Sequence, residues 1–497
     1  MPNFWSTPAL PRVDRMNDLL LNNRPLIGSD RPATTSLGTR EHVNPATGLV
    51  QAVIPICGKP EIDAAVQAAV AGQKAWRDLG PAGRRDALFR LADRVEHHEE
   101  EFSRLAALEV GTPVSTSAGK LAVSWIRYYA GWADKIEGSI TEPIGARGLA
   151  YAKHEPIGVI GVIIPWNGPL VAICMTAILA LAAGNAVVLK PPTQTPFVAI
   201  RFGELALEAG IPAGALNVVQ GDAAAGDALV AHPAVGKVSF TGGEIVAKSV
   251  MRTAAEHLKP VALELGGKSA NLVFADADLD TAAGMAATCS LIPISGQGCV
   301  LPTRVYAHAA IFDELVERIA AQAKAFAMGD PLSPSTLIGP VIHEAAAQRI
   351  MGVIERAKAE SGGQLVAGGN RGAGDLAAGA YVEPTVFAGV AHDSHLAREE
   401  VFGPVLSVIR FSDDAQAVAM ANDSRFGLGA YLHTRDLARA HTVAAQLEAG
   451  CVAVNGMLPI APNLPFGGYK QSGFGREGGR PGLEEFMQIK QVMLHLP

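Results

Sequence analysis

The chain has 497 residues, of which 49% are hydrophobic and 18% are charged, and its net charge is −7. This length exceeds that of one ordinary hydrophobic core, so we expect two or three globular domains. The acidic balance and the lack of a long basic run argue against a nucleic-acid-binding surface. The five cysteines are scattered and form no Cys/His cluster, which favours a reducing cytoplasm over a disulfide scaffold and predicts no metal site.

The N-terminus has no basic segment followed by an apolar one, so we expect no signal peptide and a cytoplasmic location. The most apolar stretch, residues 169–184, is shorter than the ~20 residues that span a bilayer. We therefore predict a buried helix there and no association with a membrane.

The first half of the chain begins with helices and then alternates between strands and helices. Residues 1–40 are rich in Pro, Asn and Ser and predict an extended arm, and helical periodicity follows at 60–80, 82–110 and 113–135. The alternation that comes next is typical of a doubly wound, Rossmann-like sheet, although no G-x-G-x-x-G fingerprint is present. Its expected strands are 159–164, 186–190, 216–220, 237–240 and 261–265, and its expected helices are 169–183, 197–209, 223–232 and 244–257.

A second α/β pattern occupies the rest of the chain. Its expected strands are 271–274, 303–308, 405–411, 429–433 and 451–455, and its expected helices are 278–291, 311–328, 344–360, 413–423 and 436–447. The C-terminal 491–497 alternates like a strand but has no core of its own, which indicates pairing with another subunit. We predict an α/β protein with one domain of residues 1–135 and 157–265, a second of 266–477, and a small β arm of 136–156 and 478–497.

Cys299 is the main candidate for chemistry. It lies in Ser295-Gly296-Gln297-Gly298-Cys299-Val300, a loop of small residues between an expected helix and an expected strand. A thiol on such a loop, partly exposed and near backbone N–H groups, is expected to have a lowered pKa and to act as a nucleophile. The alternative is a buried structural cysteine.

Two further motifs precede this loop in the sequence and add a carboxylate and an amide to the candidate site. One is Leu263-Glu264-Leu265-Gly266-Gly267-Lys268, and the other is Ile163-Ile164-Pro165-Trp166-Asn167-Gly168-Pro169. With Cys299 they make the chain resemble the aldehyde dehydrogenase superfamily from about Asn44 to the C-terminus. The resemblance implies a variant Rossmann-like NAD(P)-binding domain, a second α/β domain with the nucleophilic cysteine, and an arm that forms a homodimer or homotetramer.

The resemblance implies a covalent mechanism. Cys299 would attack the aldehyde carbonyl to give a thiohemiacetal, with the Asn167 amide and the Cys299 backbone N–H stabilising its oxyanion. Hydride transfer to the nicotinamide would leave a thioester. Glu264 would activate water to hydrolyse it, with a pKa raised by partial desolvation. Taken alone, Asn167 could be a turn residue and Glu264 a surface carboxylate.

The cofactor contacts also follow from the resemblance. Lys190 would bind the adenosine ribose, and Thr193 stands where the family often has a glutamate that repels a 2′-phosphate, so NAD and NADP are both open, with NAD slightly favoured. A helix N-terminus after Phe240 would receive the pyrophosphate, and Ala247 replaces a usual glycine there. The full expected set is Ile163, Pro165, Trp166, Lys190, Thr193, Gly221, Gly226, Phe240, Thr241, Gly242, Gly243, Leu265, Glu400 and Phe402.

The expected substrate wall is small or aliphatic and has no Arg or Lys that could hold a second carboxylate. It indicates a wide apolar tunnel for a bulky aliphatic, alicyclic or aryl aldehyde, although some of these side chains could belong to the core. The residues are Gly168, Ala172, Met175, Val300, Ile460 and Phe466.

Two other functions stay open at this point. A dehydrogenase that passes the acyl group to coenzyme A is disfavoured by Glu264, because a water-activating base would hydrolyse the thioester. A non-catalytic structural or binding relative is disfavoured because Asn167, Glu264 and Cys299 are all present.

Overall fold

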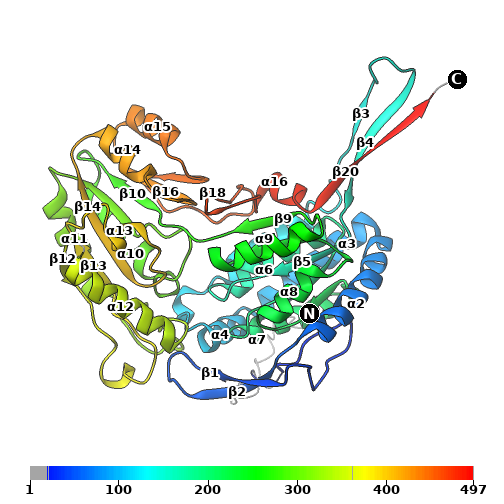
Figure 1. Ribbon diagram of the computed structural model, residues 1–497, viewed down its shortest axis with the longest axis horizontal. Coiled ribbons are helices and arrows are strands. Elements are labelled where there is room, and N and C mark those ends of the chain that lie inside the picture. The colour runs from blue at the N-terminus through cyan, green and yellow to red at the C-terminus, as the bar shows by residue number, and fades with distance from the viewer. Residues whose placement is uncertain (1–19, 21, 361, 496–497) are drawn as a thin grey trace, which may run out of the picture.

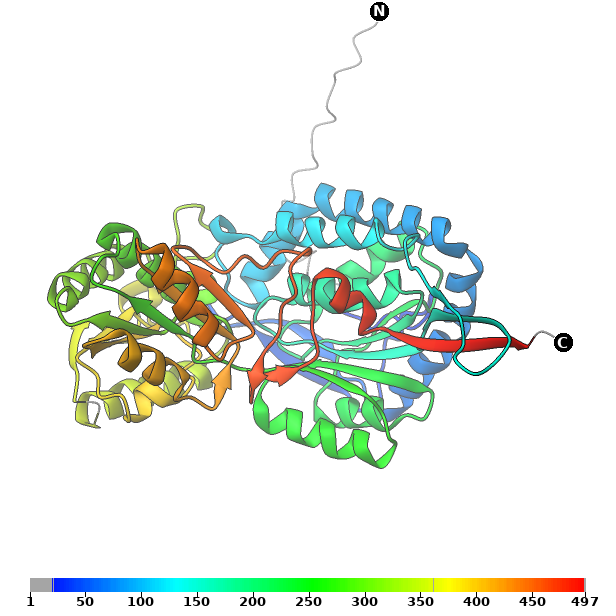
Figure 2. The ribbon, with the colours of Figure 1, turned by 90° about the horizontal axis from the view of Figure 1, so that it is seen from above.

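The computed structural model describes residues 20, 22–360 and 362–495. Two large sheets lie side by side, each covered by helices, and a thin β arm projects from one of them (Figures 1 and 2). The predicted fold class, α/β with a Rossmann-like domain, a second α/β domain and a β arm, is confirmed. Among the described residues no helix is long and apolar enough to cross a bilayer.

The first sheet has the strand order β19-β9-β8-β5-β6-β7. Its strands are β5 (Val159–Ile163), β6 (Ala186–Lys190), β7 (Leu216–Val218), β8 (Val235–Thr241), β9 (Val261–Glu264) and β19 (Gly473–Phe474). β5 to β9 are mutually parallel and rich in buried Val, Ile and Leu, as expected of strands covered on both faces. The helices between them are α6 (Pro169–Ala182), α7 (Pro196–Glu208), α8 (Ala223–Ala231) and α9 (Glu244–Glu256).

The N-terminal helices pack beside this sheet and differ from the prediction in two places, since the helix expected at 113–135 is a 3₁₀ turn followed by a shorter α-helix. They are α2 (Lys59–Asp78), α3 (Gly80–His97), α4 (Glu99–Glu109), the short 3₁₀ helix η1 (Val114–Thr116) and α5 (Gly119–Ala130). The single helix expected at 82–110 is wrong, because His98 leaves the helical region and separates α3 from α4.

An unpredicted hairpin precedes these helices. It consists of β1 (Thr39–Val43) and β2 (Val50–Pro55), which are antiparallel, and β1 begins inside the expected arm of residues 1–40. Residues 1–19 and 21 of that arm lie outside the described residues.

The second sheet has the order β12-β13-β14-β11-β10-β16-β17. Its strands are β10 (Ala270–Val273), β11 (Arg304–His308), β12 (Gln364–Ala367), β13 (Thr385–Ala388), β14 (Val405–Phe411), β16 (Gly429–His433) and β17 (Cys451–Val454). The helices are α10 (Leu279–Leu291), α11 (Phe312–Ala325), α12 (Glu344–Glu360), α13 (His395–Arg398), α14 (Asp414–Asn422) and α15 (Leu437–Gln446), with the 3₁₀ helices η2 (Pro293–Gly296) and η3 (Gly374–Leu376). β12 and β13 were not predicted.

The arm joins two distant segments of the chain. β3 (Ser139–Thr141), β4 (Gly148–Pro156) and β20 (Met487–His495) form a three-stranded sheet in which β20 pairs with the whole of β4. After β17, the chain leaves the second sheet through β18 (Tyr469–Lys470), which pairs with β15 (Phe426–Gly427), and continues through β19 and α16 (Gly479–Glu484) to β20. This crossing carries β19 onto the edge of β9, beside Glu264.

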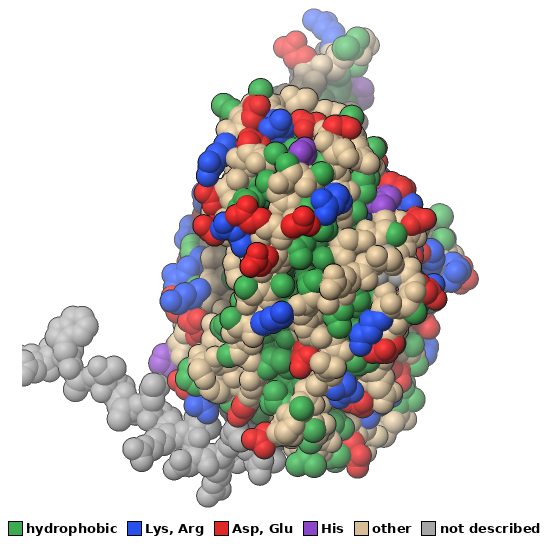
Figure 3. All heavy atoms as spheres, turned by 90° about the vertical axis from the view of Figure 1, so that its left-hand side faces the viewer, with side chains coloured by type: hydrophobic (Ala, Val, Ile, Leu, Met, Phe, Trp, Pro, Cys, Tyr) green, Lys and Arg blue, Asp and Glu red, His purple; other side chains and the backbone are tan. Residues whose placement is uncertain are grey.

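The outer end of the second domain shows Lys and Arg interspersed with Asp and Glu (Figure 3). No broad area of one sign is visible on that face, which is typical of a solvated protein surface rather than of an electrostatic docking surface.

Candidate active site

The carboxyl ends of four neighbouring parallel strands meet at one edge of the first sheet. They bring together Ile163 of β5, Lys190 of β6, the Phe240–Thr241 end of β8 and Glu264 of β9. The Gly242 N–H donates to the Glu264 carbonyl at 3.0 Å and ties the ends of β8 and β9 together. In parallel α/β sheets this edge is where ligands bind.

The loop that carries Cys299 is held by hydrogen bonds around a fully buried glutamine. The Gln297 side chain accepts from the Ile342 N–H at 3.0 Å and donates to the Ile294 carbonyl at 2.8 Å. The Asn167 amide donates to the Gln297 carbonyl at 2.7 Å, so the loop after β5 is joined directly to the cysteine loop. Sequence analysis named Gln297 in the motif but gave it no role.

The same loop contains an unusual backbone. Ile294 and Ser295 have φ of 50° and 52°, in the left-handed region that side chains with a Cβ seldom adopt. Such residues cost of order 1–3 kcal/mol each and persist only where the surroundings fix them. Here the Ser295 hydroxyl donates to the Gly339 carbonyl at 2.9 Å, which supplies one such restraint.

The glycine pair after β9 allows two close approaches. A Cβ at Gly267 would lie 2.5 Å from the Cys299 carbonyl oxygen, and one at Gly266 would overlap the Glu400 carboxylate. The Gly267 N–H donates to that carboxylate at 2.9 Å. Only glycine fits both positions, so the pair lets the Glu264 strand end, the Cys299 loop and Glu400 pack on one another.

The expectation of a lowered thiol pKa is wrong for this structure. Burial, followed by the charges of Glu400, Glu264 and Glu477, raises the pKa of Cys299 to about 12. The main cause is burial of the thiol, and the neighbouring carboxylates add to it. The thiol is therefore neutral until a base removes its proton.

Glu264 is buried more completely than the sequence suggested, with 6% of its surface exposed. Neither of its carboxylate oxygens has a hydrogen-bond partner among the described residues. Burial, and then the charge of Glu477, raise its pKa well above the usual range, although Arg476 opposes them. A Cβ at Gly467 would come within 2.8 Å of Glu264 Oε1, so the 465–477 loop covers this carboxylate closely.

Glu477 is a functional candidate that sequence analysis missed, although it ends the quoted 465–477 motif. It is buried, and burial raises its pKa to about 8. Its backbone pairs with Phe466 through two hydrogen bonds, at 2.5 and 2.8 Å. Two buried carboxyl groups that influence each other cannot both be charged cheaply, so near neutral pH the pair retains a proton.

Several of the expected adenosine contacts lie close together. Lys190 is buried and donates to the Gly221 carbonyl at 2.8 Å, which uses one of its three N–H groups. A Cβ at Gly226 would meet only Lys190 and Ile163, at 3.9 to 4.0 Å. Burial lowers the Lys190 pKa to about 8. The Lys190 ammonium keeps N–H groups that are free to donate, and Gly226 has no side chain that covers the space beside it. Both features suit the binding of a nucleotide.

The expected pyrophosphate contacts lie where α9 begins. Gly243 caps the helix, and nothing lies within 4 Å of where its Cβ would be, whereas a Cβ at Gly242 would press on the Phe240 ring at 2.7 Å. An open glycine at a helix N-terminus leaves the first backbone N–H groups accessible to an anion. Leu265 is buried, and its N–H donates to the Ser472 carbonyl at 3.0 Å.

The expected nicotinamide contacts form a second group between the two sheets. Trp166, which follows Pro165 after β5, packs edge to face on Phe402 with ring centroids 5.4 Å apart. Phe402 has a φ of 50°, and the adjacent Glu400 is the carboxylate held by Gly267. Thr193 lies apart from this group, on the turn after β6, where its hydroxyl accepts from Arg40 at 3.1 Å.

The expected substrate residues share one apolar cluster with the cysteine. Met175, Val300 and Phe466 are buried in it, and Ala172, Cys299, Cys451 and Ile460 pack against it half-buried. A Cβ at Gly168 would meet only Ile294, at 3.9 Å. Val300 packs closely on Gly429 of β16, so its side chain supports the loop from behind. Cys451, on β17, packs against the same cluster and lies close enough to Glu264 to raise its pKa, which sequence analysis did not anticipate.

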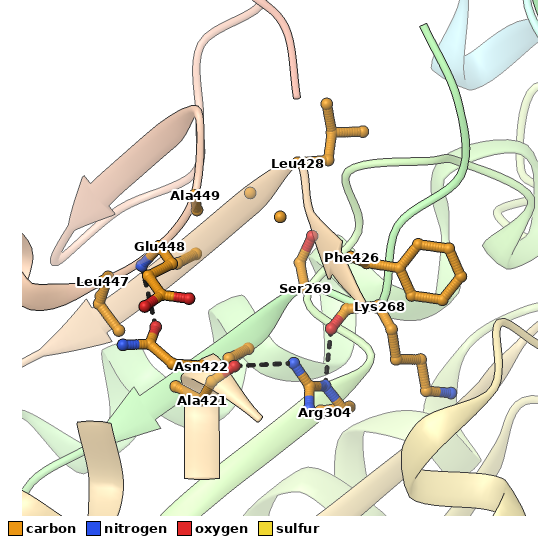
Figure 4. Close-up of a pocket in the computed structure, with 14 residues that line it drawn as sticks. Lys268, Ser269, Arg304, Ala421, Asn422, Phe426, Leu428, Leu447, Glu448 and Ala449 are labelled. Atoms are coloured by element: carbon orange, nitrogen blue, oxygen red, sulfur yellow. Dashed lines mark hydrogen bonds between the residues drawn. The ribbon is translucent and has the colours of Figure 1, made fainter. Parts of the chain in front are cut away.

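A small cavity of about 10 Å³ lies between the start of β10 and the segment that holds β15 and β16 (Figure 4). Its wall is fixed by Arg304, which donates to the Lys268 carbonyl at 2.6 Å and to the Ala421 carbonyl at 3.2 Å. This volume suits about one water molecule, so the cavity supports the site and does not hold a substrate. The buried Lys268 ammonium has no hydrogen-bond partner among the described residues, and burial lowers its pKa to about 7.

Comparison with known proteins identifies the class. Residues 33–492 match the aldehyde dehydrogenase family. The structure resembles PnpE from Pseudomonas sp. WBC-3 (38% identity, 96% of this chain and 98% of that chain, TM-score 0.93). It also resembles the NAD⁺ complex of an aldehyde dehydrogenase from Bacillus cereus (37%, 98% and 99%, 0.93) and an NADP-dependent enzyme from E. coli (36%, 96% and 99%, 0.92).

The chain belongs to the aldehyde dehydrogenase family, as its motifs indicated. It is accordingly an oxidoreductase that acts on small-molecule aldehydes with NAD or NADP, and the prediction of an enzyme is confirmed.

Proposed function

We propose that the protein oxidises a bulky apolar aldehyde to the free carboxylic acid, with Cys299 as nucleophile and Glu264 as base. The observation that carries this proposal is the junction at Gly266 and Gly267, which packs the Glu264 strand end against the Cys299 loop and Glu400. The bound nicotinamide would supply the acceptor for the hydride that leaves the aldehyde carbon.

Cys299 needs a base because its thiol is neutral in this environment. Glu264, whose own pKa is raised, lies close enough for its charge to act on the thiol. Proton transfer is most efficient when the pKa values of donor and acceptor are close. Burial raises the pKa of Glu264 and so brings it closer to the pKa of the Cys299 thiol. Glu264 therefore takes the thiol proton as sulfur attacks the carbonyl carbon.

Asn167 stabilises the oxyanion that this attack creates. Its amide is anchored to the Gln297 carbonyl, which fixes it beside the cysteine loop and leaves its second N–H free to donate. The Cys299 backbone N–H is the second donor. Preorganised donors of this kind contribute roughly 10²–10³ in rate each.

Glu264 acts again when the thioester is hydrolysed. As the carboxylate it removes a proton from water, which adds to the thioester carbon and releases the Cys299 thiolate. Because the buried Glu477 carboxyl influences Glu264 and has a pKa of about 8, it is the group that shares this proton. Both groups are shielded from bulk water, which protects the thioester from uncontrolled reaction.

The proposed substrate class follows from the residues expected to line a tunnel that leads to Cys299. Ala172, Met175, Ile460 and Phe466 belong to one apolar cluster with Cys299. The residues expected to line the substrate site, Gly168, Ala172, Met175, Val300, Ile460 and Phe466, include no Arg or Lys. Each buried methylene of a substrate contributes about 0.8 kcal/mol, until the tunnel is full. Bulky aliphatic, alicyclic or aryl aldehydes are therefore better substrates than acetaldehyde or a semialdehyde.

The test is kcat/KM, followed by NAD(P)H absorbance, across straight-chain, cyclic and aromatic aldehydes together with succinic semialdehyde. The proposal expects rising values with apolar bulk, and expects Gly168→Phe to reduce activity first on the bulkiest members. A preference for the semialdehyde would contradict it. Parallel assays with coenzyme A test the acylating alternative, which requires acyl-CoA as the product.

Two accompanying proposals concern the molecule as a whole. The β arm exposes Ile140, Ile489 and Leu494 and has no core of its own, which supports assembly as a homodimer or homotetramer. The scattered, unpaired cysteines support a cytoplasmic location.

A further inference from the structure

Arg425 joins the two halves of the molecule in the region where the cofactor is expected to lie. It immediately precedes β15, and its Nη1 and Nη2 donate to the two carboxylate oxygens of Glu399 at 2.6 and 2.8 Å. Its Nε lies 3.6 Å from the carboxylate of Glu244, the first residue of α9. Glu244 belongs to the half built on the first sheet and Glu399 to the half built on the second, so one guanidinium bridges both.

The two carboxylates of this bridge flank the expected ends of the cofactor path. Glu244 follows Gly243, where the open start of α9 is expected to receive the pyrophosphate. Glu399 precedes Glu400, which is expected to hold the nicotinamide ribose. The bridge through Arg425 therefore joins the two expected contact points at positions one residue removed from each.

The base of the Arg425 side chain is held in place by its own strand. The guanidinium lies over the ring of Phe426, 4.5 Å from the ring centroid. The Gly427 N–H donates to the Ser472 hydroxyl at 3.0 Å, and this hydroxyl donates to the Gly266 carbonyl at 2.8 Å. The strand that begins after Arg425 is thereby tied to the glycine pair after β9.

The bridge is suited to control of a ligand rather than to stabilisation of the fold. The side chains of Arg425, Glu399 and Glu244 are 39%, 35% and 25% exposed, and exposed pairs add little to folding stability. Glu244 also pairs with Lys248 on the next turn of α9, so it keeps one partner when Arg425 is removed. A ligand that touches both halves, by contrast, binds its second site with a strength that depends on the distance between the two sites.

We propose that Arg425 is a positioning residue that sets the distance between the pyrophosphate site on α9 and the nicotinamide ribose site at Glu400. It acts through Glu244 and Glu399 and does not itself contact the cofactor. The inference rests on the proposed function, because it assumes that the cofactor runs from Gly243 to Glu400. It deepens that function by naming a group outside the cofactor motifs that controls how the nicotinamide half is held.

The test compares two ligands that share the adenosine diphosphate. Calorimetry on the full-length protein measures binding of ADP, which ends at the diphosphate, and of NAD⁺, which continues to the nicotinamide ribose. The ratio of the Kd of ADP to the Kd of NAD⁺ reports the contacts beyond the diphosphate. Arg425→Met should lower this ratio roughly threefold to tenfold and leave the affinity for ADP unchanged. The burst rate of NADH formation at saturating NAD⁺ should fall as well, because the nicotinamide ring loses alignment.

Two further variants separate the bridge from a general loss of charge. Glu244→Gln removes the arm that reaches α9 and should lower the ratio to a similar degree, since any effect of its charge on the diphosphate is common to both ligands. Because both changes break one bridge, the double variant should be no worse than either single variant. Arg398→Met is the matched control, because Arg398 is also 39% exposed and donates through both Nη atoms to Asp423 within its own half. It should leave the ratio unchanged.

The outcomes distinguish the bridge from other roles of Arg425. An equal loss of affinity for ADP and NAD⁺ in Arg425→Met would indicate direct contact with the diphosphate and would overturn the proposal alone. An unaltered ratio in that variant, additive effects in the double variant, or an equal fall in Arg398→Met would also overturn it. If neither ligand binds to the wild type, the cofactor site of the proposed function fails as well.

Discussion

The two reacting groups of this site are held by opposite means. The Cys299 loop is tied by hydrogen bonds from Gln297, Asn167 and Ser295. The Glu264 carboxylate has no hydrogen-bond partner among the described residues, and it is confined instead by the backbone of Gly467 and the neighbouring Glu477.

This difference matches what each group has to do. A nucleophile must stay in line with the carbonyl carbon, so many directional bonds favour it. A base must gain and lose a proton, and hydrogen bonds to its charged form would lower its pKa and weaken it. Position is controlled on the cysteine side of the site, and proton affinity is controlled on the glutamate side.

Removing the nucleophile should have the largest effect on activity. Cys299→Ala should abolish aldehyde oxidation, because no other described cysteine lies on the Asn167-anchored loop. Cofactor binding, followed by quenching of protein fluorescence, should persist. Cys289→Ala on α10 is the matched control and should keep near wild-type turnover. Activity that survives in Cys299→Ala and disappears in the control would refute the assignment.

Glu264→Gln should separate the two chemical steps, because the amide occupies the same space but cannot take a proton. Hydrolysis of the thioester should slow by roughly 10²–10⁴, the usual contribution of a general base. Stopped-flow absorbance should then show a burst of NAD(P)H followed by a slow steady state. Loss of the burst itself would mean that Glu264 acts chiefly on the thiol.

Gln297→Ala tests the hydrogen bonds that position the Cys299 loop. It leaves the Ile342 N–H without its partner in a buried loop, at a cost of about 1–3 kcal/mol, and removes one of the two hydrogen bonds that the Ile294 carbonyl accepts. We expect a lower Tm and a burst rate reduced roughly tenfold to a hundredfold, since a small displacement of the thiol is enough to lose alignment. Cofactor affinity should stay the same. An unchanged burst rate would show that the loop is positioned by other contacts.

Glu477→Gln should change the dependence of stability on pH. Burial raises the pKa of Glu477 to about 8 in the folded protein, above its unfolded value near 4.3. The folded state therefore binds more protons across that window, and the wild type loses stability as pH rises through it. The variant lacks this proton, so its Tm relative to wild type should increase from pH 5 to pH 9. A constant difference would contradict the raised pKa.

Regular, buried elements were predictable from the sequence and short edge elements were not. The alternating apolar runs and helices from 159 to 265 were expected within a few residues of β5 to β9. β12 and β13 have four residues each, which is too short for an alternating pattern to be recognised. β12 also lies at the edge of the sheet. The β1 sequence Thr-Arg-Glu-His-Val is mostly polar and exposed, and it gains its structure by pairing with β2.

The site was predictable where motifs carry it and not where tertiary contacts create it. Cys299, Glu264 and Asn167 stood out by their local sequence. The contact between Arg40 and Thr193 joins residues 153 positions apart, and no local pattern specifies it. The thiol pKa was mistaken for the same reason, since burial by the fold raises it most, and the acids that add to it, such as Glu400 and Glu477, are distant in sequence.

The most direct test of the account is to trap the covalent intermediate. Glu264→Gln is mixed with an apolar aldehyde and NAD(P), quenched in acid during the burst, and digested for mass spectrometry. The account predicts one acyl group per subunit, on the peptide that contains Cys299. An unmodified Cys299 peptide, or an acyl group on Cys451 instead, would contradict it.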